Sequence, residues 1–507
     1  MTEAPTEVRV AYPPQRLAAL LGLPPPTAQQ AEVIATPLEP VLVVAGAGSG
    51  KTETMAGRVM WLIANGLVRP EQVLGLTFTR KAAGELATRV RRRLAQLAGT
   101  PEFSHLRATT LAGEPTIATY HAYASRVVAE HGLRSGIEPS ARLLTEAACW
   151  QLADAVVRTY DGDMSAVEFA PVTVTKAVLD LAADLAEHLR DERELAAYTD
   201  EFVAEVASRP GRVMAPVLKL LGRQQARAQL LPLVEAYTRR KREADAVDFA
   251  DLMARAAVTA RDHPQVAEVE RERFRVVLLD EYQDTSHAQI VLLRSLYGDG
   301  HPVTAVGDPC QSIYGWRGAS AGTLQRFPTD FPCADDAPSA TLPLSVSWRN
   351  RPEILQVANG LSESLRNGVH QVPVLRAAPD NGAAPEHSAV VRCALLPTVA
   401  DEAEWIADRL AEAWTAQPQT PTAAVLVRMR RQIPLLEAAL RARGLPVEVV
   451  GLGGLLDTPE VREITCTLRV LADPTDGAAL LRLVAGPRWR VGPRDIVMLH
   501  RRARGLA

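Results

Sequence analysis

The sequence predicts an α/β fold built on parallel sheets, into which helical segments are inserted. Short apolar runs at residues 41–44, 73–77, 275–279 and 303–306 have the length and composition of buried strands, and helical stretches separate them. The first run leads directly into a glycine-rich loop and then into a helix. Strands that alternate with helices form parallel sheets, and such sheets bind ligands at the carboxyl ends of their strands.

Length and composition describe an ordinary folded protein of several domains. The 507 residues predict about three or four domains. Hydrophobic residues make up 47% of the chain and charged residues 23%. The formal net charge is −3, so any contact with nucleic acid must come from local arginine clusters rather than from a global basic field.

The chain carries no sign of a membrane segment or of a disulfide framework. No apolar run approaches the roughly 18 residues of a membrane span, and the N-terminus lacks a basic region followed by an apolar core. We therefore expect a cytoplasmic protein that contacts no membrane. The cysteines lack CxxC spacing, which argues against disulfide frameworks and zinc sites. They are Cys149, Cys310, Cys333, Cys393 and Cys466.

The loop after the first strand has the composition of a phosphate-binding loop. Its glycines let backbone N–H groups curl around a phosphate chain, and Lys51, one of only five lysines, supplies a positive charge to the outer phosphates. Thr52 offers a hydroxyl to Mg²⁺. A chance glycine loop is the alternative, which the flanking strand and helix disfavour. The loop comprises Ala45, where the pattern usually begins with glycine, Gly46, Ala47, Gly48, Ser49, Gly50, Lys51 and Thr52.

Two carboxylates follow the strand at residues 275–279. Asp280 is placed to hold Mg²⁺ directly or through water, and Glu281 to accept a proton from an attacking water. A solvated acidic cluster is the alternative, which the preceding apolar run disfavours. More than two hundred residues separate Lys51 from Asp280, and this spacing fits an ATPase with a large insertion better than a small GTPase or a P-loop kinase.

Residues 307–319, GDPCQSIYGWRGA, place a phosphate-sensing glutamine close to aromatic side chains. Gln311 can hydrogen-bond a terminal phosphate oxygen. Tyr314 and Trp316 offer flat faces to unstacked bases, and Arg317 offers a planar donor to a phosphate. This combination predicts that the segment couples nucleotide state to a nucleic-acid base. An ordinary turn with packed aromatic side chains is the alternative.

The pattern changes twice along the chain. Between about residues 132 and 246 it becomes alanine-, leucine- and glutamate-rich with helical periodicity, which predicts an inserted helical domain. A proline-rich break at residues 332–343 precedes a second α/β pattern, with a strand at 423–427 and a helix at 433–443. From about residue 458 the pattern is helical again.

Seven segments, in this order, resemble the early motifs of superfamily 1A DNA helicases, the UvrD, Rep and PcrA group with RecB as a relative. The resemblance covers essentially the whole chain. It implies two RecA-like P-loop motor domains, each interrupted by a helical insertion, and ATP-driven movement 3′ to 5′ on single-stranded DNA. The segments are PTAQQAEVI around Gln30, AGAGSGKT at 45–52, LTFTRKAAGEL at 76–86, ATYHAY at 118–123, LLDEYQDT at 278–285, VGDPCQSIYGWRGA at 306–319 and LSVSWRNRPEIL at 344–355.

The resemblance also implies roles for single residues. Gln30 would read adenine, and Trp348, where the family more often has tyrosine, would stack on that base. Arg349 would reach the γ-phosphate from the second motor domain, with a salt bridge at a helix start as the alternative. His121 would lie on the DNA path, with a packing or capping role as the alternative. The full DNA path would comprise Phe78, Thr79, Arg80, His121, Tyr314, Trp316 and Arg317.

The implied division of the chain has five parts, and it depends on the resemblance. Motor domain 1A would consist of residues 1–131 and 246–338, with helical insertion 1B at 132–245 between them. Residues 339–457 would be the first part of motor domain 2A, and 458–507 the start of helical insertion 2B.

Some positions depart from the family pattern. Glu53 stands where an arginine is common, so a phosphate contact from this position loses its support. Arg80 and Ser347 each replace a usual asparagine. The arginine run at residues 89–93 has two interpretations, a track for a DNA backbone and a solvated helix face, and we favour the solvated face.

The late family motifs do not occur in the sequence. We therefore expect this chain to be the N-terminal portion of a longer protein, and the isolated 507 residues to be weak or inactive as an enzyme. GWRGAS, GKTETM and the arginine-rich composition are similar to AdnB-type helicase–nuclease subunits of actinobacteria. That similarity implies a nuclease domain beyond residue 507 and a heterodimer partner.

The expected function of the parent protein is that of an ATP-dependent 3′–5′ DNA helicase or translocase in DNA repair or recombination. ATP and Mg²⁺ would be its cofactors, and single-stranded DNA, DNA junctions or DNA ends its partners. The alternative is a vestigial scaffold subunit that binds ATP or DNA without turnover. The intact catalytic set argues against a scaffold, namely Lys51, Thr52, Asp280, Glu281, Gln311 and Arg349.

Overall fold

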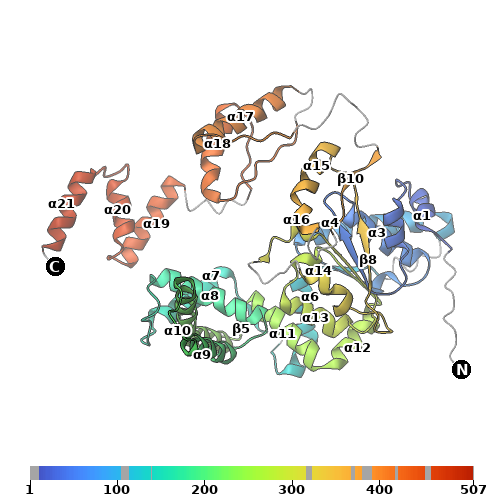
Figure 1. Ribbon diagram of the computed structural model, residues 1–507, viewed down its shortest axis with the longest axis horizontal. Coiled ribbons are helices and arrows are strands. Elements are labelled where there is room, and N and C mark those ends of the chain that lie inside the picture. Colours follow the sequence, from blue (N-terminus) through green and yellow to red (C-terminus); the bar gives the residue numbers. More distant parts are fainter. Residues whose placement is uncertain are drawn as a thin grey trace. The chain divides into compact units, whose positions relative to one another are not determined.

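The structure is a computed structural model that describes residues 11–103, 113–138, 140–315, 322–366, 372–379, 391–416, 421–450 and 458–505 (Figure 1). The chain divides into a larger unit, Met1–Val391, and a smaller unit, Arg392–Ala507. All five cysteines are free thiols. No helix within the described ranges combines the length and the apolar character that crossing a membrane requires.

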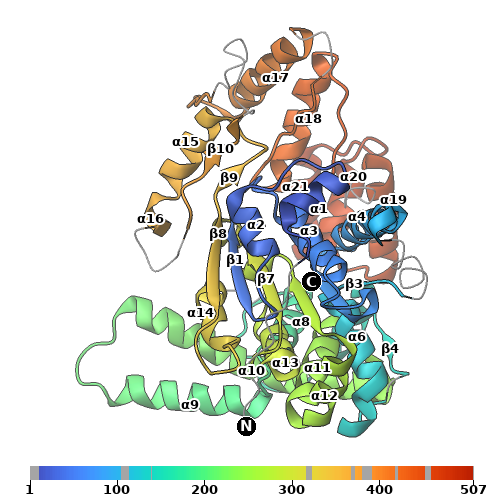
Figure 2. The ribbon, with the colours of Figure 1, turned by 90° about the vertical axis from the view of Figure 1, so that its right-hand side faces the viewer.

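A six-stranded parallel sheet forms the centre of the larger unit. The spatial order is β3-β2-β6-β7-β1-β8, and β1, β7 and β8 lie side by side in Figure 2. This order brings the carboxyl ends of β1, β6 and β7 to one edge of the sheet, which confirms the predicted α/β architecture. The strands are β1 (Val41–Ala45), β2 (Val73–Thr77), β3 (Thr116–Thr119), β6 (Val276–Leu279), β7 (Val303–Gly307) and β8 (Ala340–Leu344).

Helices cover both faces of this sheet, and alternate residues of each strand enter one of two cores. Leu42 and Val44 of β1 belong to one core, whereas Val43 and Ala45 belong to the other. The first core contains side chains from α6 (Tyr120–His131), α11 (Phe249–Asp262), α12 (Pro264–Arg273), α13 (His287–Tyr297) and α14 (Gly322–Asp330). The second contains side chains from α1 (Pro14–Leu20), α2 (Ala28–Ile34), α3 (Lys51–Ala64) and α4 (Arg80–Gly99).

A helical part of the larger unit has a hydrophobic core of its own. Ala153, Val178 and Leu233 are fully buried in it. Two short strands, β4 (Arg142–Leu143) and β5 (Ala246–Val247), pair where this part begins and ends. The helical stretch predicted between about 132 and 246 is therefore present. Its helices are α7 (Glu146–Arg158), α8 (Pro171–Glu187), α9 (Glu192–Ser208) and α10 (Ala215–Glu243).

The predicted proline-rich break at residues 332–343 is partly wrong, because its last residues belong to strand β8. This strand pairs with β1 at the edge of the sheet, and Pro343 lies opposite Val44. Proline lacks a backbone N–H and is tolerated on an edge strand, where only one side is paired. A proline cluster was therefore compatible with a strand at this position.

The segment after β8 adds short elements to the larger unit. Strands β9 (Val346–Ser347) and β10 (Arg376–Ala377) pair in parallel. Helices α15 (Pro352–Leu361) and α16 (Glu363–Arg366) lie between them in the sequence.

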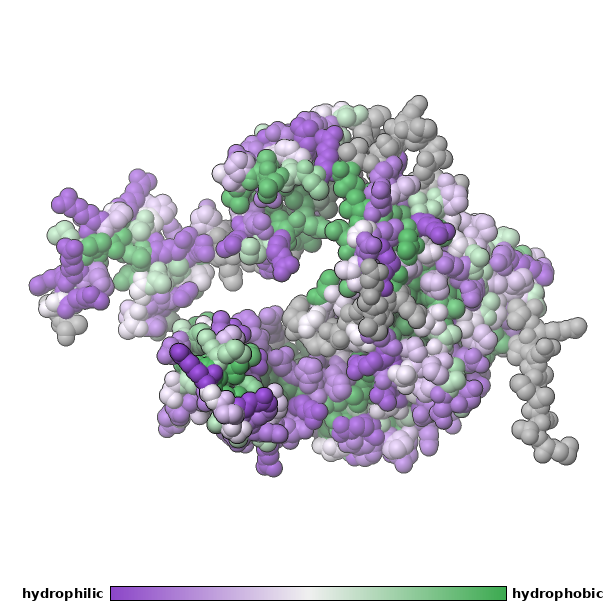
Figure 3. Space-filling model, viewed as in Figure 1, coloured by the Kyte–Doolittle hydropathy of each residue, from purple (hydrophilic) through white to green (hydrophobic). Residues whose placement is uncertain are grey.

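The smaller unit is helical in its described part, and the predicted strand at residues 423–427 is wrong. Val425 and Val427 pack against the core between α17 (Val399–Thr415) and α18 (Ile433–Ala442), whereas Leu426 is 93% exposed. This alternation is that of a strand, but no described residue pairs with it. Figure 3 shows apolar side chains at the surface of this unit over α18 and α20. Its helices are α17 (Val399–Thr415), α18 (Ile433–Ala442), α19 (Pro459–Ala472), α20 (Gly477–Ala485) and α21 (Pro493–Arg504).

Candidate nucleotide-binding site

The glycine loop connects the end of β1 to the first turn of α3. Gly48 and Gly50 have φ angles of +76° and +82°, which L side chains rarely adopt. A Cβ atom on Gly50 would lie 2.8 Å from Nε2 of Gln30. Within the described ranges, the buried hydroxyl of Ser49 has no hydrogen-bond partner. A glycine loop at the N-terminus of a 14-residue helix presents backbone N–H groups, which suits a phosphate chain.

The side chain of Lys51 points across the loop to the end of β6. Its Nζ atom lies 3.0 Å from Oε2 and 3.2 Å from Oε1 of Glu281. Only 12% of the lysine side chain is exposed, so solvent screens this ion pair weakly. Glu281 has a φ of +53°, a backbone strain of the kind that clusters at functional sites.

Asp280 is buried at the same strand end. Its backbone N–H donates to the carbonyl of Leu76, and among the described residues its buried Oδ1 has no hydrogen-bond partner. Burial, reinforced by the nearby charge of Glu281, raises the pKa of Asp280 to about 6. A carboxylate oxygen without a protein partner next to a phosphate-binding loop fits a divalent cation, which would restore its charged form. Thr52, half-buried in the first turn of α3, is the second predicted ligand.

Gln283 joins the acidic strand end to the loop after β7. Its Nε2 donates to Oε2 of Glu281 at 2.9 Å, and its Oε1 accepts from the backbone N–H of Asp308 at 3.0 Å. Asp308 in turn accepts from Nε2 of Gln311 at 2.6 Å. Contacts therefore run without a break from Lys51 through Glu281, Gln283 and Asp308 to Gln311.

Sequence reasoning missed Gln283. The available signal was its position two residues after Glu281 in the DEYQD segment, where a short 3₁₀ turn, Tyr282–Asp284, returns the side chain to the strand end. The next residue, Asp284, also reaches the loop after β7, because its Oδ1 accepts from the backbone N–H of Ile313 at 3.2 Å.

The segment around Trp348 docks on the glycine loop. The hydroxyl of Ser347 donates to the carbonyl of Ala47 at 3.0 Å, and the backbone N–H of Trp348 donates to the carbonyl of Gly48 at 2.8 Å. A Cβ atom on Gly48 would lie 2.7 Å from Cβ of Arg349, which places this arginine directly over the loop. Arg349 is exposed, and no ion pair to it is found in the described part of the chain. The alternative of a salt bridge at a helix start is therefore not observed.

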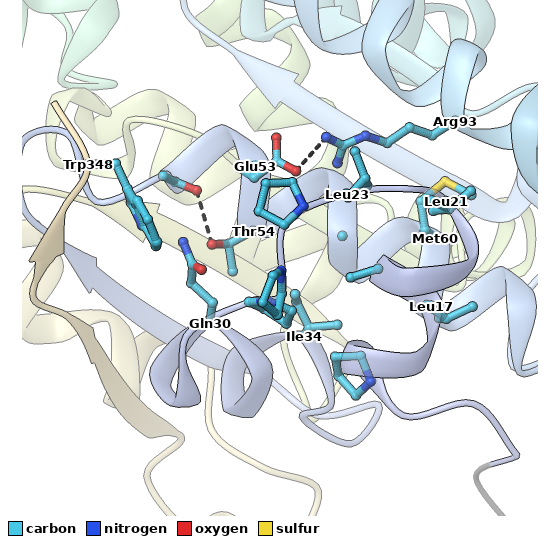
Figure 4. A pocket seen from close by; sticks show the side chains of 17 residues that line it. Leu17, Leu21, Leu23, Gln30, Ile34, Glu53, Thr54, Met60, Arg93 and Trp348 are labelled. Atoms are coloured by element: carbon cyan, nitrogen blue, oxygen red, sulfur yellow. Dashed lines mark hydrogen bonds and ion pairs between the residues drawn. The ribbon is translucent and has the colours of Figure 1, made fainter. Parts of the chain in front are cut away.

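Trp348 and Gln30 line a pocket of about 460 Å³ beside the loop (Figure 4). The amide of Gln30 bonds the backbone at both ends: its Oε1 accepts from the N–H of Thr27 at 3.0 Å and its Nε2 donates to the carbonyl of Ser49 at 3.1 Å. Gln30 thus caps α2 and fixes the glycine loop. The base contact that the resemblance implied for Gln30 stays a prediction.

The favoured interpretation of the arginine run at 89–93, a solvated helix face, is wrong for Arg93. This side chain is buried, lines the pocket and pairs with Glu53 (Figure 4). Helical periodicity contained the signal, because Arg93 falls on the same buried stripe of α4 as Val90 and Leu97. Arg91 and Arg92 are exposed, as expected.

The predicted DNA path is partly described. The rings of Phe78 and Tyr314 are parallel within 7°, with centroids 6.3 Å apart, so the structure brings these two residues together. Thr79 caps α4 by accepting from the backbone N–H of Ala82, and Arg80 is exposed. His121 packs edge-on against the ring of Phe249. Trp316 and Arg317 lie outside the described residues.

Two family models match the chain. The UvrD/REP helicase N-terminal domain matches residues 26–332, and the UvrD-like helicase C-terminal domain matches residues 342–507. Parts of both domains are therefore present, which does not support the expectation of an N-terminal portion only. The parallel sheet agrees with the RecA-like fold that the resemblance implied.

Three named relatives are similar over most of this chain. DNA helicase II of Escherichia coli is 29% identical over 94% of it, and ATP-dependent DNA helicase UvrD1 of Mycobacterium tuberculosis is 30% identical over 92%. ATP-dependent DNA helicase PcrA of Staphylococcus aureus is 27% identical over 92%. The chain spans 58%, 55% and 56%, respectively, of the length of these relatives.

Proposed function

Because the chain belongs to the UvrD/REP helicase family, we propose that its protein is an ATP-dependent DNA helicase or translocase that moves 3′ to 5′ on single-stranded DNA. The observation that carries this proposal is the continuous chain of contacts from Lys51 through Glu281 and Gln283 to the loop that bears Tyr314. A nucleotide at the glycine loop would contact one end of this series of contacts, and a DNA base would contact the other end. We propose that this helicase or translocase acts in DNA repair or recombination.

The residues present fit ATP and Mg²⁺. The glycine loop and Lys51 would hold the phosphates, and Thr52 and Asp280 would hold the cation, whose positive charge would stabilise the buried carboxylate. Glu281 would accept the proton of the attacking water. Arg349, already over the loop, would neutralise charge that develops on the transferred phosphoryl group.

The same contacts give a route for coupling. Gln311 would hydrogen-bond the terminal phosphate, and its present partner Asp308 is held by Gln283. A change at Gln311 would therefore reach the backbone of the loop that carries Tyr314. The predicted DNA contacts are Phe78, Thr79, Arg80, His121, Tyr314, Trp316 and Arg317.

Several narrower expectations stay predictions. The relatives named above are DNA helicases of the UvrD and PcrA type, and their names do not bear on an AdnB-type assignment, a nuclease domain or a heterodimer partner. The five-part domain division, the cytoplasmic location and the preference for DNA junctions or ends are likewise untested.

An unwinding assay tests the proposal. The parent protein that contains this chain should open a duplex with a 3′ single-stranded tail in the presence of Mg²⁺ and ATP, whereas the same duplex with a 5′ tail should stay closed. Opening of the 5′-tailed duplex alone would contradict the direction. DNA binding without any unwinding or ATP turnover would favour the scaffold instead.

A further inference from the structure

The pocket beside the glycine loop is mainly apolar, but one wall is charged. Its volume of about 460 Å³ lies within the range of small-molecule sites. Of its polar side chains, Gln30 bonds the backbone through both Oε1 and Nε2, and Thr54 donates to the carbonyl of Gly50 at 3.0 Å. Glu53 and Arg93 remain as the charged pair. The apolar lining comes mainly from Leu17, Leu21, Leu23, Pro24, Ile34 and Met60.

The two charged residues come from different helices. Glu53 lies in the first turn of α3 and Arg93 in the third quarter of α4, and Nη2 of Arg93 donates to Oε1 of Glu53. The arginine side chain is only 6% exposed, whereas the glutamate is 46% exposed. Among the described residues, Nε of Arg93 is buried without a hydrogen-bond partner.

The pair of a buried Arg93 and a half-exposed Glu53 adds little to the stability of the fold. Burying a guanidinium costs free energy, and one carboxylate that is itself half in water returns little of it. An apolar side chain at position 93 would continue the buried stripe of Val90 and Leu97 without that cost. Stability alone therefore does not explain a charged side chain at this position, whereas a ligand contact of Arg93 inside the pocket would.

A nucleobase matches the chemistry of these walls. It has two flat apolar faces and a polar edge, so an apolar pocket with one charged wall accommodates both. A planar guanidinium stacks on a ring face and donates to ring acceptors, which a lysine ammonium cannot do in the same way. Figure 4 shows Arg93 and the indole of Trp348 on opposite sides of Glu53.

We propose that Arg93 contacts the nucleobase of the bound nucleotide, and that Glu53 is a positioning residue that holds the guanidinium in place. The inference rests on the proposed function and deepens it. Glu53 leaves a phosphate contact from position 53 without support, and the inference assigns a base contact to Arg93 instead. The pair thus raises affinity for nucleotides that carry a base and leaves the phosphate contacts unchanged.

Calorimetric binding of two ligands tests this proposal. AMP-PNP carries a base and inorganic tripolyphosphate does not, and both are titrated with Mg²⁺ into the wild-type chain and its variants. Arg93→Ala should weaken AMP-PNP binding about tenfold and leave tripolyphosphate binding unchanged. Arg93→Lys should recover only part of the loss, because it restores charge without the planar group.

Glu53→Ala provides a second variant that leaves Arg93 in place and removes a half-exposed group. It should weaken AMP-PNP binding about threefold, and the double variant should bind no more weakly than Arg93→Ala alone, because Glu53 acts through Arg93. Arg89→Ala is the matched control, since Arg89 also donates to Glu53, at 3.5 Å, but does not line the pocket. It should bind both ligands as the wild type does.

The outcomes separate this inference from the proposed function. AMP-PNP binding at wild-type affinity by folded Arg93→Ala, or an equal loss for both ligands, would overturn the base contact. AMP-PNP binding at wild-type affinity by folded Glu53→Ala would overturn the positioning role of Glu53. Lys51→Ala reports on the phosphates instead. If it bound both ligands as the wild type does, the proposed function would fail.

Discussion

The ammonium group of Lys51 lies 3.0 Å from the carboxylate of Glu281, although 230 residues separate the two in the sequence. Strands β1 and β6 end at the same edge of the parallel sheet, and this edge brings the two charges together. Gln283 then connects Glu281 to the loop after β7. The contacts at one sheet edge therefore form one network.

Gln283→Ala should uncouple DNA binding from ATP hydrolysis. The variant removes both hydrogen bonds that link Glu281 to Asp308. The bond to the carboxylate of Glu281 contributes about 1.5–3 kcal/mol, and the bond from the neutral backbone N–H of Asp308 about 0.5–1.5 kcal/mol. We expect the stimulation of ATPase by single-stranded DNA to fall about tenfold or more, with little change in DNA affinity. Steady-state ATPase rates with and without oligothymidine measure this.

Gln289→Ala is the control for that variant. Gln289 is also buried, but its amide oxygen accepts from the backbone of Ser286 and caps α13. The control should lower the melting temperature and keep DNA stimulation. Equal stimulation of Gln283→Ala and wild type would show that the network carries no coupling.

Asp280→Asn should stabilise the metal-free protein at alkaline pH. The pKa of Asp280 is about 6 in the fold against an ordinary value of 3.8, so the folded state binds the proton more tightly than the unfolded chain. The resulting contribution of Asp280 to the free energy of unfolding is complete below the unfolded pKa and is lost as pH rises through about 6. The shift corresponds to about 3 kcal/mol at most.

Thermal unfolding without Mg²⁺ checks this sign. Asp280→Asn should unfold at a higher temperature than wild type at about pH 8, and the difference should narrow at about pH 5. Asp262→Asn serves as control, because hydrogen bonding to Arg261 lowers the pKa of Asp262 and predicts no gain. If Asp280→Asn had the melting temperature of the wild type at about pH 8, the claim that the buried, ionised carboxylate destabilises the fold would be contradicted.

Gly46→Ala should impair nucleotide binding in a way that a second change repairs. A Cβ atom on Gly46 would lie 2.1 Å from Cδ2 of Leu375, whose backbone Asn359 holds through two hydrogen bonds. Leu375→Ala should therefore restore binding to Gly46→Ala. Gly48→Ala should lose about tenfold in affinity without rescue, because its φ of +76° disfavours any Cβ. The test measures nucleotide dissociation constants for Gly46→Ala and Gly48→Ala, each with and without Leu375→Ala. Rescue of Gly48→Ala by Leu375→Ala would contradict the role of its positive φ.

Tyr314→Ala should weaken binding of single-stranded DNA about tenfold, because stacking on one base contributes about 1–3 kcal/mol. Tyr314→Phe keeps the ring parallel to Phe78 and should bind as the wild type does. Fluorescence anisotropy of labelled oligothymidine measures both. Equal affinities for the alanine and phenylalanine variants would remove Tyr314 from the DNA path.

Motif-bearing strand ends were predictable from the sequence, whereas their side-chain partners were not. The apolar runs, the glycine loop and the acidic pair place Lys51, Asp280 and Glu281 at one sheet edge. The double contact of Gln283 depends on how β6 and β7 lie side by side, which no local pattern contains. Arg93 was misjudged because the run of arginines concealed the helical stripe to which one of them belongs.

Strands were predicted well only where neighbouring strands exist. Residues 423–427 have the composition of a strand but find no neighbour within the described residues. Residues 340–344 lie in a proline-rich stretch and yet form an edge strand, because β1 offers the pairing partner. Pairing partners, rather than local composition, decide such cases.

The central claim is that Lys51 and the acidic strand end form one site that hydrolyses ATP under the control of DNA. The most direct test is the rate of Mg-ATP hydrolysis by the parent protein that contains this chain and by its Lys51→Ala variant, each with and without single-stranded DNA. We predict that DNA stimulates the wild type about tenfold or more, and that Lys51→Ala shows no turnover under either condition. Turnover that survives Lys51→Ala, or a folded wild type whose rate ignores DNA, would contradict the claim.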